Sequence, residues 1–77
     1  MGDLSKRVVE VALQYLGPAS PVFLERQTMR HMNGLHIGDL EPMHLQDLQR
    51  WVRISASLVI DKTKAVELSE RIGNLKV

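Results

Sequence analysis

Seventy-seven residues are enough for one small domain and no more, so residues 1–77 are expected to form a single helical domain. Hydrophobic residues make up 44% and charged residues 25%, which is the balance of a globular chain rather than a disordered one. Ten Lys and Arg oppose nine Asp and Glu, and this net charge of +1 argues against a nucleic-acid or anionic-membrane partner.

Features that the sequence lacks exclude further classes of protein. The chain has no cysteine, which excludes disulfides and thiolate metal sites. Charged residues interrupt the apolar positions of residues 1–16, so this stretch does not resemble a signal peptide. No window is apolar for long enough to span a membrane. We therefore expect a cytoplasmic protein without a membrane partner.

The first predicted helix runs from Leu4 to Leu16, because its apolar residues recur at the spacing of one helical face. Gly17 follows the last apolar residue and can take the left-handed backbone that ends a helix. Pro18 lacks the N–H group that a continuing helix would need. The sequence therefore predicts that this helix stops at Gly17-Pro18.

A second helix is predicted from Pro21 to about Met32. Proline is favoured at the first helical position, and Ser20 just before it can accept hydrogen bonds from unpaired N–H groups. We expect Ser20 to cap the helix, which is a simpler interpretation than a kinase target. A phosphate-binding loop would need more glycines and a following Gly-Lys-Ser/Thr, which this stretch lacks.

The connection that follows is predicted to be irregular. Asn33-Gly34 is a turn dipeptide, and Pro42 marks the start of a third helix. Three apolar residues of this connection are expected to attach it to the core: Leu35, Ile37 and Leu40.

The third helix is expected to extend to Ile60, and it is apolar on two sides. One stripe is formed by Leu45, Leu48, Val52, Ala56 and Val59, which suits the core of the domain. The second stripe is formed by Trp51, Ile54 and Leu58. One small domain can hardly cover both stripes, so the second is a candidate partner-binding surface, although neighbouring helices could also bury it.

Asp61 or Thr63 is expected to cap a fourth helix, in which Ala65, Leu68, Ile72 and Leu75 follow the helical period. The sequence thus predicts an all-α fold. Its expected architecture is a small bundle of four helices with an irregular connection between the second and third.

The sequence contains no convincing catalytic or metal-binding set. His31, His36 and His44 are five and eight residues apart, which places no pair on one helical turn, and surface or capping roles are expected. Ser55 and Ser57 are expected to bond the preceding backbone turn. We expect no enzyme activity, no cofactor and no small-molecule substrate, since a bundle of this size has little room for a cleft.

Four arginines suggest an alternative function. Arg26 and Arg30 lie one helical turn apart, as Arg50 and Arg53 nearly do, and together they could form a basic, DNA-binding face. A helix-turn-helix would need a connection of about three or four residues, shorter than the predicted one. The chain also has only three aromatic residues, too few for a base-stacking platform.

Residues 16–72 carry a family resemblance. The matching residues are Gly17-Pro18-Ala19, Phe23-Leu24-Glu25-Arg26-Gln27, Leu45, Leu48, Trp51-Val52, Ser55-Ala56-Ser57-Leu58, Ala65, Leu68 and Ile72. This pattern resembles a small helical domain of poorly defined role at the ends of bacterial and archaeal signalling proteins. The resemblance implies a protein-interaction or regulatory module without catalytic residues, either free-standing or excised from a longer chain.

The resulting hypothesis is a non-enzymatic protein–protein interaction or regulatory module in bacterial signalling. Its partner would be another protein or a second copy of itself in a homodimer, bound through Trp51, Ile54 and Leu58. A small DNA-binding regulator is the alternative.

Overall fold

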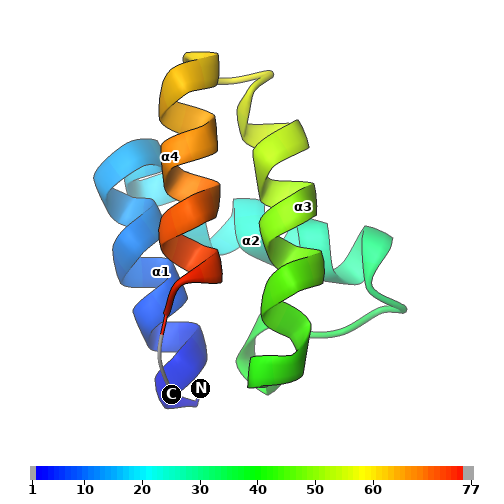
Figure 1. Ribbon diagram of the computed structural model, residues 1–77. Coiled ribbons are helices and arrows are strands. Elements are labelled where there is room, and N and C mark those ends of the chain that lie inside the picture. The colour runs from blue at the N-terminus through cyan, green and yellow to red at the C-terminus, as the bar shows by residue number, and fades with distance from the viewer. Residues whose placement is uncertain (1, 76–77) are drawn as a thin grey trace.

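The computed structural model describes residues 2–75, and all the regular structure among them is helical, which confirms the all-α class. Three helices lie roughly side by side and a fourth, α2, crosses behind them (Figure 1). The helices are α1 (Asp3–Leu16), α2 (Ser20–His31), α3 (Leu45–Ala56) and α4 (Lys62–Gly73). The short 3₁₀ turns are η1 (Gly17–Ala19), η2 (Ile37–Asp39) and η3 (Pro42–His44).

The expectation of four separate helices needs correction. No residue separates α1, η1 and α2 along the chain, and η3 leads directly into α3. Apart from the single turn η2, the described residues therefore form three continuous helical stretches, 3–31, 42–56 and 62–73. α1 and α2 are the two arms of the first stretch, which bends at η1.

Gly17 sits at this bend with φ 65° and ψ −150°, a conformation that is almost confined to glycine. The predicted capping role of Ser20 is wrong. Ser20 already has helical angles and lies inside the first turn of α2, where its buried hydroxyl donates to the Gly17 carbonyl at 2.7 Å. The backbone of Gly17 thus turns the chain at η1, and the hydrogen bond from Ser20 to Gly17 spans the bend.

The hydrophobic core is assembled from one face of each helix. Most of the predicted core stripes of α1 and α4 is buried, because these residues recur every three or four positions. Tyr15, Leu16 and Leu75 are half-buried, and Leu75 lies beyond the end of α4. Asp61 caps α4 by accepting from the Thr63 N–H at 3.1 Å. The buried apolar residues are Leu4, Val8, Val11, Ala12, Leu24, Met32, Ile37, Leu40, Leu45, Leu48, Val52, Ala56, Ala65, Leu68 and Ile72.

α3 is shorter than predicted. It ends at Ala56, and the next backbone N–H groups, those of Leu58 and Val59, bond carbonyls three residues back. This tightening is a usual way to end a helix. Consequently Val59, expected in the core stripe, is 66% exposed.

The connection between α2 and α3 follows its prediction. Asn33 and Gly34 both have positive φ, and Leu35 donates to the Met32 carbonyl at 3.1 Å to close a tight turn. Ile37 and Leu40 are buried, and Leu35 packs against the core. The Glu25 carboxylate of α2 holds the connection by accepting from the Ile37 N–H and by pairing with His36.

A polar contact joins α2 to α3. The Ser55 hydroxyl donates to Gln27 Oε1 at 2.7 Å, and the Gln27 amide donates to the Phe23 carbonyl at 3.3 Å. Ser55 therefore does not bond its own preceding turn, contrary to prediction, whereas Ser57 does so through the Ile54 carbonyl. Because Gln27 is almost fully buried, the Ser55 hydroxyl satisfies an acceptor that has little access to water.

We predict that Ser55→Ala lowers the free energy of unfolding by about 1–3 kcal/mol, because it leaves Gln27 Oε1 without a donor. The double variant Gln27→Leu/Ser55→Ala should recover part of that loss, since both polar partners are then gone. Urea denaturation measures the cycle. Ser57→Ala, which removes a bond on the exposed surface, is the control and should cost no more than about 0.5 kcal/mol. Equal losses in the two serine variants would contradict the prediction.

Candidate interaction surface

The three histidines lie in different environments. His31 stacks on Trp51, His36 pairs with Glu25, and His44 accepts from the Glu41 N–H in a capping box at the start of η3. Among residues 2–75, no group of three His, Cys, Asp or Glu could hold a metal ion. Each imidazole thus has a structural contact of its own.

The predicted partner-binding stripe is divided by the fold. Trp51 is half-buried, packs against the core and stacks on His31 with ring centroids 4.0 Å apart and planes at 10°. Ile54 is 51% exposed and Leu58 83% exposed, but Leu58 lies beyond the end of α3. Two of the three side chains are therefore accessible, whereas Trp51 is largely committed to intramolecular contacts.

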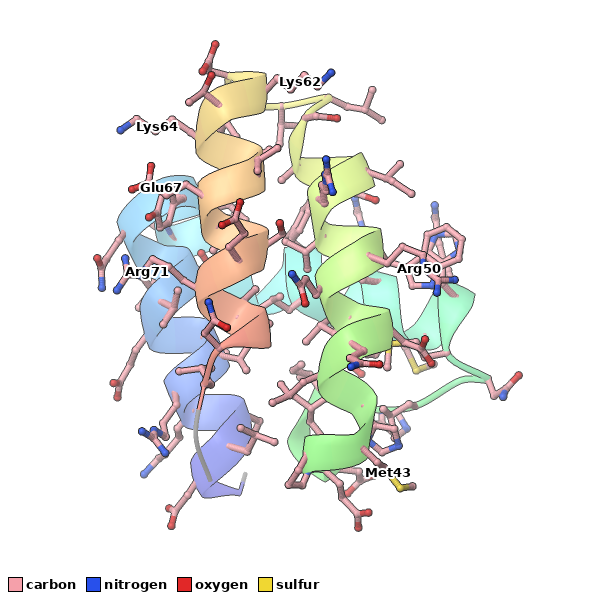
Figure 2. The ribbon with its side chains drawn as sticks, in the orientation of Figure 1. Met43, Arg50, Lys62, Lys64, Glu67 and Arg71 are labelled. Atoms are coloured by element: carbon pink, nitrogen blue, oxygen red, sulfur yellow. The ribbon has the colours of Figure 1, made fainter. Side chains whose placement is uncertain are left out.

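The four arginines of the predicted basic face are exposed but do not gather around one hollow. Arg50 and Arg53 line the same shallow hollow beside Ile54, and Figure 2 shows Arg50 pointing away from α4. Arg26 lines a different hollow, near the end of α1, and Arg30 borders neither. Arg50 and Arg53 of α3 therefore lie at one hollow, and Arg26 lies at another.

A largely apolar surface hollow lies where α1, α2 and the α3–α4 connection meet, and we call it the apolar groove. Its volume is about 340 Å³, within the range of ligand-binding sites. Val22 and Val59 are 59% and 66% exposed on it, although they are distant in sequence. The groove is lined by Tyr15, Leu16, Ala19, Val22, Phe23, Arg26, Val59 and Ile60.

A second hollow of about 270 Å³ continues from the apolar groove toward α4. Tyr15 and Ile60 line both hollows, so the surface is continuous across these two side chains. The far side of the second hollow is formed by Gln14 and Lys64. Figure 2 shows Lys64, Glu67 and Arg71 projecting from one side of α4. The combined surface extends from Arg26 on α2 to Lys64 on α4.

The groove was not predicted from the sequence. Val59 was expected in the core stripe of a longer third helix, and Val22 had no expected role. One signal was available, because Val22, Phe23 and Leu24 are consecutive on a helix and cannot all face the core. Only Leu24 is fully buried, while Val22 is left on the surface.

The comparisons with known proteins give no further guidance: no family model, no curated protein and no solved structure matches the chain. Among residues 2–75, no helix has both the length and the apolar character needed to cross a membrane.

We predict that His31→Ala shifts the fluorescence of Trp51, the sole tryptophan, to longer wavelength and makes it easier to quench with acrylamide, because one ring face becomes hydrated. The lost stacking should also lower stability by about 0.5–1 kcal/mol. His36→Ala is the control, since His36 contacts Glu25 and not the indole. An emission spectrum that His31→Ala leaves unchanged would contradict the stacked arrangement.

Proposed function

We propose that this chain is a non-enzymatic protein–protein interaction or regulatory module that binds its partner through the apolar groove. The observation that carries this proposal is the exposure of both Val22 and Val59 at one apolar hollow. Apolar surface that is concave and left in contact with water is typical of binding sites, since its burial against a partner is favourable. The groove uses residues from three parts of the chain, so it depends on the folded domain.

The stripe of Trp51, Ile54 and Leu58 remains a second proposed contact, limited to the exposed Ile54 and Leu58. The setting in bacterial signalling and in the cytoplasm belongs to the same proposal and rests on the family resemblance and the composition. A second copy of the chain is among the partners considered, because closed dimers often cover apolar patches.

Site-specific photocrosslinking tests the proposal in cells that naturally express the chain. We predict that a photoreactive amino acid at position 59 or 22 gives a discrete, light-dependent adduct of higher mass. Met43 is the control position, because it is 75% exposed but lies in η3, outside the groove. Figure 2 shows it at the far end of α3 from the α3–α4 connection.

The adducts also distinguish the partners. An adduct of twice the mass of the chain would identify a homodimer, and mass spectrometry would identify any other protein. Equal labelling at positions 43 and 59, or no adduct at positions 22 and 59, would show that the groove is not an interaction surface.

A small DNA-binding regulator is the second candidate. It is favoured by Arg53, which lines two adjoining hollows, one with Arg50 and the other with Lys62, with no carboxylate in either lining. The net charge of +1 opposes it, because binding to DNA depends largely on neutralising phosphates.

We predict no appreciable binding of random duplex DNA by the wild type at physiological salt in a mobility-shift assay. A salt-dependent shift that Arg50→Gln/Arg53→Gln abolishes would reverse the order of the two candidates. Lys6→Gln/Arg7→Gln, which removes the same two charges from α1, is a control for a general loss of charge.

A further inference from the structure

The charged side chains that line the apolar groove and the adjoining second hollow are both cations. Arg26 lines one end of the combined surface, and Lys64 lines the other. No Asp or Glu contributes to the lining of either hollow. A bound segment would therefore find apolar contacts along the middle and a cation at each end.

Both cations are available to a partner. The Arg26 side chain makes no hydrogen bond, ion pair or ring contact within residues 2–75. Lys64 has only a long contact, 3.7 Å, with Glu67, and both side chains are mostly exposed. An exposed pair of this kind contributes little, about 0–1 kcal/mol, so a partner carboxylate can replace Glu67 at small cost.

Three of the nine carboxylates of the chain are bound elsewhere, which contributes to this bias despite the near-neutral composition. Glu25 accepts from the Ile37 N–H, Glu41 closes the capping box of η3, and Asp61 caps α4. Each of these acids thus satisfies backbone N–H groups rather than an arginine or a lysine of the groove.

We propose that the groove binds an amphipathic helix of a partner protein, with an apolar anchor between Val22 and Val59 and a carboxylate on each side of it. One carboxylate would pair with Arg26 and the other with Lys64. This inference rests on the interaction function proposed above and specifies the chemistry of the partner. The mode is helix-in-groove, since residues 2–75 contain no strand to which an extended peptide could add.

A second copy of the chain fits this surface less well. In a closed twofold dimer, the same patch faces itself. Each groove would then present its cations to a partner patch that also lacks a carboxylate in its lining. An acidic partner from another protein removes this repulsion and gives each cation an opposite charge.

A selection from a displayed library of random helical peptides tests the proposal with the full chain as bait. We expect the selected peptides to share a Leu, Ile or Phe anchor with Asp or Glu enriched on both sides. The strongest peptide is then synthesised, and its dissociation constant is measured by fluorescence anisotropy at low and high salt.

Two sets of variants separate the apolar from the electrostatic contribution to binding, and each set has a control variant with the same net charge. Val22→Gln/Val59→Gln leaves the net charge unchanged and should weaken binding by about tenfold or more, because the anchor loses its apolar contacts. Arg26→Gln/Lys64→Gln should weaken it about three- to tenfold at low salt and much less at high salt. Met43→Gln and Arg50→Gln/Arg53→Gln are the respective controls, and circular dichroism verifies folding.

The possible outcomes distinguish the two proposals. Peptides with basic or uncharged flanks that still require Val22 and Val59 would overturn the acidic partner but support an interaction groove. Peptides that bind Val22→Gln/Val59→Gln as well as the wild type, or no enrichment at all, would overturn both. Sedimentation as a dimer, or binding to phosphatidylserine vesicles that Val22→Gln/Val59→Gln abolishes, would replace the partner helix with another occupant and overturn this inference.

Discussion

The bend at Gly17 is the constraint on which the rest of the structure depends. A straight helix over residues 3–31 would carry its second half away from the domain, whereas the bend at η1 turns α2 across the back of α1, α3 and α4 (Figure 1). Only glycine readily adopts φ 65° with ψ −150°. This crossing places Gln27 against Ser55, His31 against Trp51, and Val22 on the same groove as Val59.

The early end of α3 is the second requirement of the groove. A helix that continued to Ile60 would keep Val59 on the core stripe with Val52 and Ala56. Because the chain tightens after Ala56 and turns toward α4, Val59 and Ile60 reach α1 and α2 instead. The groove is therefore formed by two local features, each confined to a few residues, that lie about forty positions apart in the sequence.

Periodicity predicted the buried faces of α1, α3 and α4 well, since core burial is what selects apolar residues at helical spacing. The sequence did not predict hydrogen bonds correctly for polar side chains that have more than one possible partner. Ser20 was expected to cap a helix but donates to the Gly17 carbonyl three residues back. Ser55 was expected to bond its own preceding turn but donates to Gln27, 28 residues away in sequence. The end of α3 was also missed, because no glycine or proline separates Ala56 from Asp61. The groove could not be predicted, as it requires knowing both of these local endings and the path of α2.

The charge distribution shows why a net charge of +1 is a poor description of this surface. Helix starts and turns present unpaired N–H groups, and carboxylates are the strongest acceptors for them. Glu25, Glu41 and Asp61 are used in this way, whereas guanidinium and ammonium groups cannot accept hydrogen bonds and so have no such role. In this domain, three carboxylates are thereby held by the backbone, whereas cations such as Arg26 stay at the surface, next to exposed apolar residues. The proposed partner helix would pair its carboxylates with these cations and pack its apolar residues against these exposed side chains.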